Sequence, residues 1–429
     1  MQEKAFIESN DVTFVSASKA NKIAEAFFGT LSNDPVTKGS IRLASTETIG
    51  DSRNENKPLM YVMNYADGGF VIISATKDYY PVLAYSDEGT FVLSEDIGSV
   101  VVWLEESEEA IRQSKTLDKK IKAKISSMWR RYDPTGNIIS HKATTKSLSS
   151  EKDDAMANRI GELTNMGYTC YSLESAYTEG LISYNLYQAS LTNAYELGTL
   201  EYPIVVFGNN YSSSQVGPLV STMWGQNNSY NALCNNFPAA AGCGTIAIAQ
   251  IMKFHQFPST YDWANMDNYS ATYATQSLIR DIYARIGSTS NPNESKSALE
   301  YFGYNATIYN HDKLSVESEL FQNNRPIFMS GFTSNDTGHA WVCDGVYKES
   351  SENYHYVEFL IDNSGDYYYE WDKNICTPSS PIYTGGYIST YFHMNWGWYS
   401  YSDGWFAGND VNTSEGNYNH VRKNIYVSR

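Results

Sequence analysis

The chain has 429 residues, enough for about two or three domains at roughly 150 residues each. Its 31 basic and 48 acidic side chains give a formal charge of −17, which repels phosphate backbones and argues against nucleic acid as a partner. The 35 tyrosines and the 14% aromatic content favour a secreted or cell-surface protein.

The first residues, MQEKAFIESNDV, contain no apolar segment typical of a secretory signal. No stretch of the sequence approaches the ~18 apolar residues that a membrane span requires, so we expect no membrane-spanning segment. Either the protein is cytosolic, or it is a secreted or cell-surface protein from whose sequence a signal peptide has been removed and to which Met1 has been added.

The N-terminal part predicts a small α+β unit. Residues 16–29, SASKANKIAEAFFG, place apolar side chains on one helical face and end at a glycine. Residues 59–75 predict two apolar strands joined around the Asp-Gly-Gly turn at 67–69, and residues 81–93 predict a second hairpin. Residues 101–131 predict a long charged helix or a pair of helices.

Residues 133–152 are polar, rich in Ser, Thr and Lys and poor in apolar periodicity, which is typical of an exposed linker open to proteolysis. We therefore divide the chain into a domain of residues 1–145 and a domain of residues 146–429. Residues 154–196 predict helices. The C-terminal half, rich in Tyr, Trp and Gly, predicts short alternating strands.

Cys243 stands between two glycines in AAAGCGTIAIAQIMKFHQFP, residues 239–258. The run from Gly244 to His255 is small or apolar nearly all round, which predicts a buried central helix. A thiol in the first helical turn lies near free N–H groups and the positive end of the helix dipole, both of which favour the thiolate. The flanking glycines would let a substrate main chain approach. Cys243 is therefore a candidate nucleophile, and a buried structural cysteine is the alternative.

The five cysteines contain no CxxC pair, and their odd number leaves at least one thiol unpaired. Neither a zinc ribbon nor a complete disulfide framework is indicated, and we expect no metal or cofactor.

A catalytic thiol needs an imidazole partner. His255 is excluded because it lies about 18 Å further along the same helix. His339, in NDTGHAWVCDGV, follows a polar loop and opens an alternating strand that could hold the ring rigidly, and His393, in YFHMNWGWYSYSDGW, is its rival. The remaining histidines are expected at the surface or in the linker: His311, His355, His420 and His141.

Two further segments could complete such a site. Asn395, in HMNWGW, is a neutral acceptor for the second ring nitrogen of the histidine, and Trp396 could shield that hydrogen bond from water. Gln226, in STMWGQNNSYN, could donate to an oxyanion. Taken singly, each has a plainer explanation: packing of aromatics beside glycines for the first, and a surface amide for the second.

Five segments in chain order resemble the streptopain family of papain-like cysteine peptidases. They are GPLVSTMWGQNNSYN (217–231), AAGCGTIAIAQIMKFHQFP (240–258), LEYFGYNATIYN (299–310), TGHAWVCDGV (337–346) and FHMNWGWYSYSDGWF (392–406). Residues 68–91, GGFVIISATKDYYPVLAYSDEGTF, resemble that family's propeptide. The resemblance implies an α+β fold: a two-lobed papain-like domain, with a central helix plus an antiparallel sheet, preceded by a small α+β prodomain.

The resemblance also assigns site residues by position. These are the nucleophile Cys243, the general base His339, the oxyanion-hole residue Gln226, and Asn395 and Trp396 in the segment that orients and covers the histidine. The implied reaction is acyl transfer that hydrolyses peptide bonds. The family usually has Val-Ala-Thr-Ala after the cysteine, whereas this chain has Gly-Thr-Ile-Ala at 244–247, a difference that bears on the packing of the first helical turn.

The resemblance further implies a zymogen of bacterial origin, secreted or at the cell surface, and thereby favours the alternative in which a signal peptide has been removed from the sequence. Its own prodomain would act as an intramolecular inhibitor until the linker is cut, and proteins or peptides would be its substrates. Three alternatives remain open. Residues 1–145 could be a permanent regulatory domain; the chain could be a non-catalytic papain-fold binding protein that uses its Tyr/Trp-rich half; or the same dyad could serve an amidase or transglutaminase.

Overall fold

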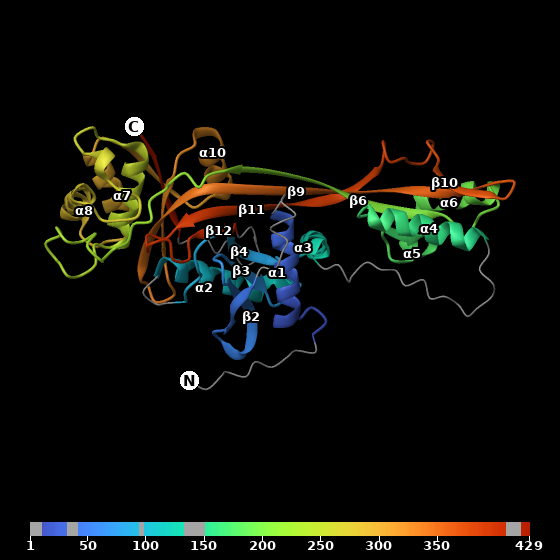
Figure 1. The fold of residues 1–429 in the computed structure, drawn as a ribbon, viewed down its shortest axis with the longest axis horizontal. Coiled ribbons are helices and arrows are strands. Elements are labelled where there is room, and N and C mark those ends of the chain that lie inside the picture. The colour runs from blue at the N-terminus through green and yellow to red at the C-terminus, as the bar shows by residue number, and fades with distance from the viewer. Residues whose placement is uncertain (1–10, 32–41, 94–97, 133–150, 409–421) are drawn as a thin grey trace. The chain divides into compact units, whose positions relative to one another are not determined.

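The computed structural model describes residues 11–31, 42–93, 98–132, 151–408 and 422–429 (Figure 1). The chain forms two compact units: unit 1 is Met1–Tyr132, Ser213–Lys348 and Ser389–Arg429, and unit 2 is Asp133–Ser212 and Glu349–Ile388. Unit 1 thus contains most of the expected prodomain and most of the expected peptidase. The expected linker lies, up to residue 150, outside the described residues, so the division between residues 145 and 146 stays a prediction.

The N-terminal part of unit 1 is an antiparallel sheet with helices against it. Its strands pair in the order β1 (Leu43–Asp51), β2 (Asn54–Tyr65), β3 (Phe70–Ser74) and β4 (Val82–Ser86), and its helices are α1 (Ala17–Leu31), α2 (Gly98–Gln113) and α3 (Lys119–Tyr132), with the 3-10 turn η1 (Ser114–Thr116). Helix α1 buries the predicted apolar face. The hairpin predicted around 67–69 and the helix pair predicted over 101–131 are both confirmed.

The second predicted hairpin, over 81–93, is wrong. Only its first half is a strand, β4, and the partner on the other side of β4 is β12 (Gly404–Ala407), where Trp405 lies opposite Tyr85. The second half of the segment contacts the same C-terminal region, since the Val92 N–H donates to Ser402 Oγ at 3.0 Å. The apolar residues of 81–93 are therefore used against a distant part of the chain.

The rest of unit 1 continues this sheet and adds helices. From β4 the strand order is β12, β11 (Ile382–Asn395), β9 (Gly338–Asn363), β8 (Ile327–Phe332), β13 (Lys423–Ser428) and β7 (Asn305–Asn310). The helices are α7 (Cys243–His255), α8 (Tyr273–Ile286), α9 (Pro292–Tyr301) and α10 (Lys313–Asn323), with the 3-10 turn η2 (Trp263–Asn265). The prediction of short strands is confirmed for β7, β8, β12 and β13 and wrong for β9 and β11, which are long and contribute residues to each unit.

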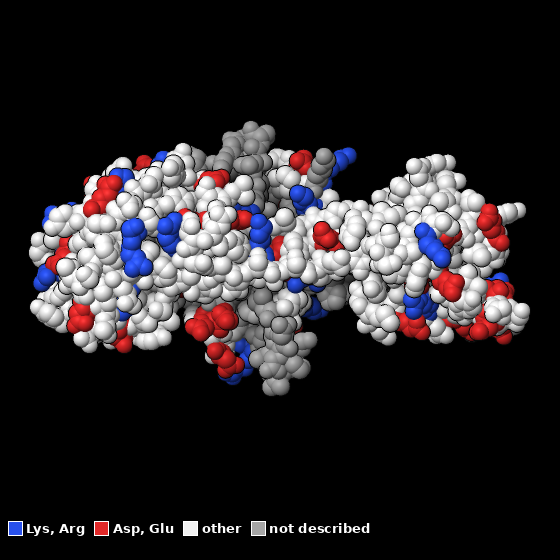
Figure 2. Space-filling view, turned by 90° about the horizontal axis from the view of Figure 1, so that it is seen from above, with Lys and Arg blue, Asp and Glu red and all other residues white. Residues whose placement is uncertain are grey.

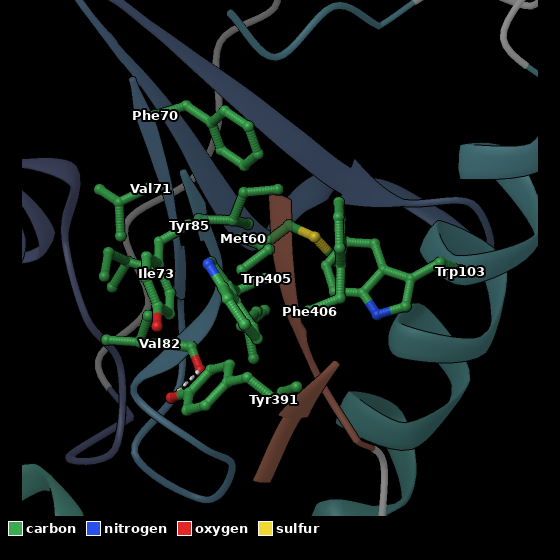
Figure 3. Packing of buried hydrophobic residues seen from close by; sticks show 14 of the residues in the cluster. Met60, Phe70, Val71, Ile73, Val82, Tyr85, Trp103, Tyr391, Trp405 and Phe406 are labelled. Carbon is green, nitrogen blue, oxygen red and sulfur yellow. Dashed lines mark hydrogen bonds between the residues drawn. The ribbon is translucent and has the colours of Figure 1, made fainter. Parts of the chain in front are cut away.

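One hydrophobic core joins the N-terminal and C-terminal parts of unit 1 (Figure 3). The Trp103 ring of α2 meets the Phe406 ring of β12 edge-on, with centroids 4.9 Å apart. The Tyr391 hydroxyl of β11 donates to the Val82 carbonyl of β4 at 3.2 Å. The first 132 residues are therefore bound to the C-terminal strands through buried apolar surface as well as through strand pairing.

A second core surrounds α7, which Figure 1 shows beside α8. Helix α7 is buried on nearly all sides, as its apolar sequence predicts; its fully buried side chains include Ile246, Ile248, Ile251 and Met252. The α+β class, the central helix and the antiparallel sheet expected from the sequence are confirmed.

Unit 2 has its own core and a mixed fold. Its elements are α4 (Glu151–Asn165), β5 (Thr169–Ser172), α5 (Leu173–Thr178), α6 (Tyr184–Glu196) and β10 (Asp366–Trp371), together with most of β6 (Ile204–Val216) and parts of β9 and β11. Arg159 of α4 holds the buried Glu358 of β9 through two hydrogen bonds of 2.8 and 2.9 Å. The helices predicted over 154–196 are present, with β5 inserted between them.

All five cysteines lie in described ranges, and all are free thiols. Within the described ranges, no helix combines the length and apolarity needed to cross a bilayer. Figure 2 shows acidic and basic side chains interspersed over one face of the protein.

Candidate active site

Cys243 is the first residue of α7, as predicted, and is partly exposed. Its Sγ accepts a hydrogen bond from the main-chain N–H of Ala340 at 3.3 Å. Ala340 follows His339 at the start of β9. The fold therefore brings the thiol to the first residues of the strand that carries the candidate base.

The glycines beside Cys243 have a different function from the expected one. A Cβ on Gly242, whose φ is +94°, would lie 2.5 Å from Ser288 Cα, and a Cβ on Gly244 would lie 2.3 Å from the Thr289 carbonyl oxygen. The loop that follows α8 thus occupies the space next to both glycines. The prediction that they leave room for a substrate main chain is wrong, because the protein's own main chain fills that space.

Burial shifts the pKa of both candidate groups in the direction that favours their uncharged forms. Burial raises the pKa of Cys243, and the N–H donors of Ala340 and of the first helical residues oppose that rise only in part. Burial lowers the pKa of His339, against the opposing effect of the Glu105 carboxylate. The predicted effect of the helix start on the thiol is therefore present, but burial outweighs it in the full-length chain.

His339 lies at the end of a hairpin that an N-terminal helix contacts. It is opposite Gly331 in the β8–β9 pair, and the connecting loop contains Ser334. Glu105 of α2 accepts hydrogen bonds from the Ser334 N–H at 2.6 Å and from the Ser334 hydroxyl at 2.8 Å. The helix thus holds the loop from which the strand of the candidate base begins.

The rival histidine, His393, is engaged elsewhere. Its Nδ1 lies 2.6 Å from Asp344 Oδ1, and its ring packs edge-on against Trp405. Asp344 is fully buried, and its second carboxylate oxygen accepts the Val220 N–H at 2.8 Å. Within the described residues, no contact links His393 with Cys243.

The remaining described histidines are buried or partly buried. His255 is buried at the end of α7. The surface location predicted for His355 is wrong: it is 2% exposed and packs against Phe207 in the core of unit 2. His311 is partly buried beside Asn424. His141 and His420 lie outside the described residues.

Asn395 and Trp396 lie at the end of β11, next to α7. Asn395 Oδ1 accepts the Gln250 Nε2–H at 2.9 Å and the Gly397 N–H at 3.1 Å, while its Nδ2 donates to the Thr222 carbonyl at 2.9 Å. The Trp396 side chain is fully buried and donates from Nε1 to the Ser402 carbonyl at 2.9 Å. In the described part of the chain, no contact joins Asn395 to His339.

Gln226 is buried, at 6% exposure, which excludes the surface-amide alternative. Its main-chain carbonyl accepts the Ala241 N–H at 2.8 Å, two residues before Cys243. The preceding Gly225 is required because a Cβ there would lie 2.1 Å from the Tyr399 ring. The structure thus brings Gln226 to the N-terminal side of the thiol.

Three side chains of this region were missed by sequence reasoning: Gln250, Asp344 and Glu105. Gln250 lies two turns after Cys243 on the same side of the helix, at about 3.6 residues per turn, and this spacing could have identified it. Asp344 is an acidic residue inside the apolar run AWVCDGV, which signals a buried partner. Glu105 carries no sequence signal, because its contact depends on the packing of distant segments.

Among the described residues, no three His, Cys, Asp or Glu side chains gather closely enough to hold a metal ion.

Comparison with known proteins gives two family matches and a set of relatives. Residues 12–111 match the Spi protease inhibitor family, and residues 224–281 match the Peptidase C10 family. The streptopain of Streptococcus pyogenes serotype M1 is 24% identical, with 94% of this chain and 84% of that protein covered. The streptopain of serotype M28 gives the same identity and coverage.

Solved structures of interpain A from Prevotella intermedia are also similar. A prointerpain A fragment is 17% identical, with a TM-score of 0.45, over 89% of this chain and 98% of that chain. The active wild-type interpain A is 19% identical, with a TM-score of 0.30, over 49% of this chain and 94% of that chain. Of the residues discussed above, the peptidase match contains Gln226 and Cys243, and the inhibitor match contains Trp103 and Glu105.

Proposed function

We propose that this chain, which is a streptopain-like cysteine peptidase with its own propeptide, is the latent precursor of an exported endopeptidase. In this proposal residues 1–145 are the inhibitory prodomain and residues 146–429 are the catalytic domain. Cutting within residues 133–152 activates the enzyme. Its substrates are proteins or peptides.

The proposed reaction is acyl transfer through a covalent thioester. The Cys243 thiolate attacks the carbonyl carbon of the scissile bond, and the oxyanion is stabilised by the Gln226 side chain and the Cys243 N–H. Protonated His339 gives its proton to the leaving amine as the C–N bond breaks. Neutral His339 then takes a proton from the water that attacks the thioester, and hydrolysis frees Cys243.

The observation that carries this proposal is the 3.3 Å hydrogen bond from the Ala340 N–H to Cys243 Sγ. It brings the thiol next to the residue after His339, although the two segments are far apart in sequence. The backbone contact of Gln226 with Ala241 adds an amide side chain on the N-terminal side of the thiol. These two hydrogen bonds support the proposal because they link the segments of the proposed base and oxyanion donor to the segment of the proposed nucleophile.

The contacts of α2 support a latent state. Besides the bonds of Glu105 to Ser334, the neighbouring Glu106 accepts the Arg422 Nε–H at 2.9 Å, and both of these side chains are buried. Ser334 precedes the strand of His339, and Arg422 precedes β13, which pairs with β8. The prodomain helix therefore holds the histidine hairpin from two sides.

Activation would follow from the loss of these contacts. Without Glu105, the loop that contains Ser334 is free to move, and His339 at its end can turn its ring toward Cys243. Proximity of the two groups raises the pKa of the imidazole and lowers that of the thiol, since each charged form stabilises the other. The pair would then favour the thiolate and the imidazolium, against the opposite pKa shifts that burial causes in the precursor.

Asn395 and Trp396 are assigned to the segment that orients and covers His339. Trp396 packs against Trp341, two residues after His339 on β9, with ring centroids 5.4 Å apart. In this proposal the buried indole of Trp396 shields the base from water, and its packing against Trp341 fixes the position of the start of β9. The hydrogen bonds of Asn395 fix the main chain that carries the indole.

The proposal is tested by incubating the full-length chain and mapping its products by mass spectrometry. We expect cleavage within residues 133–152, followed by stoichiometric alkylation of Cys243 by a peptidyl epoxide. Cys243→Ala should retain the fold and lose both reactions. A processed fragment that resists the epoxide, or a Cys243→Ala chain that still processes itself, would contradict the proposal.

A further inference from the structure

We propose that Gln250 is a positioning residue of the peptidase, whose side-chain amide holds the Asn395 turn and the Thr222 segment against the helix that begins at Cys243. This inference rests on the proposed function and deepens it. It concerns a residue that does not touch substrate and acts through the placement of the groups that do.

The position of Gln250 on α7 is the first observation. Two turns separate it from Cys243, so both side chains leave the helix on the same side. Ile246 lies between them on that side, and a Cβ on Gly397 would lie 3.2 Å from its Cγ2. One face of α7 therefore carries the thiol at its start and rests on the 395–397 turn one and two turns later.

The hydrogen bonds of Gln250 are the second observation. Its Nε2 donates to Asn395 Oδ1 at 2.9 Å and to the Thr222 carbonyl at 3.0 Å, and Asn395 Nδ2 donates to the same carbonyl. All three residues are buried: Gln250 is 1% exposed, Asn395 is 4% exposed and Thr222 is 2% exposed. They form a buried junction between α7, the end of β11 and the segment that leads to Gln226.

This junction reaches both sides of the proposed reaction centre. On one side, Asn395 is followed by Trp396, which packs against Trp341 in the strand of His339. On the other side, Thr222 begins the short stretch that ends at Gln226. A change at Gln250 would therefore shift the base and the oxyanion donor relative to the thiol.

The junction also defines how Asn395 acts. Its Oδ1 accepts two N–H groups, from Gln250 and Gly397, so both lone pairs of that oxygen are in use. Asn395 therefore orients His339 through the main chain and Trp396, and the imidazole receives no hydrogen bond from its side chain.

The stability of the core does not explain an amide at this position. Gln250 Oε1 is buried and has no hydrogen-bond partner in the part of the chain that the structure describes, and such an acceptor destabilises a fold. A methionine would fill the same space without that cost. What glutamine adds is a pair of directed N–H groups, which fix two segments at a set distance from the helix.

The test compares processed peptidases that carry Gln250 and Gln250→Met. We expect kcat to fall about 10- to 100-fold, because a misplacement of roughly 1 Å has effects of that size, while KM changes by less than about threefold. We also expect the pH at which iodoacetamide begins to alkylate Cys243 to rise by about one unit, since a displaced imidazole stabilises the thiolate less.

The matched control is Lys253→Met, on the next turn of the same helix. Lys253 Nζ donates to the Trp263 carbonyl at 2.5 Å, so this variant also removes a side-chain N–H donor from α7 and leaves Asn395 untouched. Its kcat and its alkylation profile should stay within about twofold of the unmodified enzyme, by the usual additivity of distant sites.

Gln250→Glu provides a test that does not depend on the methionine variant folding. An ionised carboxylate cannot donate to Asn395 Oδ1, whereas a protonated one donates a single O–H. The activity of this variant relative to the unmodified enzyme should therefore rise as the pH is lowered through the pKa of the new carboxyl group.

A Gln250→Met enzyme with the kcat and alkylation profile of Lys253→Met, or a Gln250→Glu enzyme whose relative activity is independent of pH, would overturn the positioning role. Failure of the proposed function would look different: the unmodified processed enzyme itself would lack alkylation below the ordinary pKa range of a thiol.

Discussion

The carboxylate of Glu105 accepts two hydrogen bonds from Ser334, at 2.6 Å from its N–H and 2.8 Å from its hydroxyl. Glu105 belongs to the N-terminal segment, and Ser334 belongs to the loop that leads into His339. These two bonds restrain the hairpin of the proposed base while the N-terminal segment is attached.

Glu105→Ala should therefore weaken latency. We expect self-processing of the full-length chain to accelerate by roughly 5- to 30-fold, the factor that corresponds to about 1–2 kcal/mol. Gel-based timing of precursor loss measures it. The control is Glu109→Ala, since Glu109 pairs with Arg53 and Arg112 inside the N-terminal segment. Equal rates for both variants would show that the Ser334 contact does not restrain the enzyme.

His339→Ala and Asn395→Ala should differ in severity. Loss of a general base costs about 10²–10⁴-fold in rate, so we expect His339→Ala to fall near the upper end of that range. Asn395→Ala should cost about 10- to 100-fold, because Asn395 sets geometry and transfers no proton. Values of kcat/KM on a fluorogenic peptide compare them. Equal losses would mean that the function assigned to Asn395 is wrong.

Trp103→Ala should destabilise the precursor and leave the mature enzyme unchanged. The Trp103 ring packs against Phe406, and its removal should lower the free energy of unfolding of the full-length chain by about 3–5 kcal/mol. Denaturant unfolding should be measured in the Cys243→Ala background, because that substitution prevents self-processing during the measurement. Trp129→Ala, on α3, removes a buried indole that is bonded to the Tyr79 carbonyl. If only Trp103→Ala accelerates self-processing in the chain that retains Cys243, the contact between Trp103 and Phe406 is the one that keeps the precursor latent.

Gly244→Ala should disable the site. A Cβ there lies 2.3 Å from the Thr289 carbonyl oxygen, so either the loop or the first turn of α7 must move. We expect overpacking to lower the free energy of unfolding by about 1–3 kcal/mol and the epoxide to label Cys243 no longer. Gly161→Ala in α4 meets no atom within 4 Å and should be neutral or stabilising. Normal labelling of Gly244→Ala would show that the loop yields without cost.

The His393–Asp344 pair should make stability depend on pH. Burial alone would lower the pKa of His393, but the attraction of Asp344, with smaller contributions from Asp403 and Asp87, raises it above its ordinary value. A raised folded-state pKa stabilises the protein fully below the unfolded pKa of about 6.5, and this contribution is lost as the pH rises through the folded value.

The Tm difference between the unmodified Cys243→Ala precursor and its His393→Gln derivative should therefore be largest below about pH 6.5 and shrink above it. Thermal melts across pH 5 to 9 would measure it. A difference that stays constant over that interval would show that His393 is not charged in the fold.

The sequence predicts α7 well because its signal is local. Apolar residues on every side of the segment leave no way to place it except inside the protein, and the thiol at its start follows directly. The hairpin around residues 67–69 is predicted for the same reason: its turn chemistry and its two strands are neighbours in sequence.

Contacts between distant segments could not be predicted in this way. The apolar segment around Val92 is as consistent with a local hairpin as with a contact to Ser402. Periodicity indicates that a segment is buried, but it does not identify the segment that packs against it. His355 occurs among polar residues, yet the strand around it is buried on both faces. Asn395 was expected to face an imidazole, and only the packing of α7 reveals Gln250 as its partner.

The pairing of β4 with β12 predicts how the processed enzyme would interact with the released N-terminal segment. If the first 132 residues leave after cleavage, as the proposed activation requires, β12 would become an edge strand of its sheet, with Phe406 newly exposed beside unpaired backbone amides and carbonyls. Such an edge would bind its former neighbour again, so the released segment should inhibit the processed enzyme in trans until it is digested.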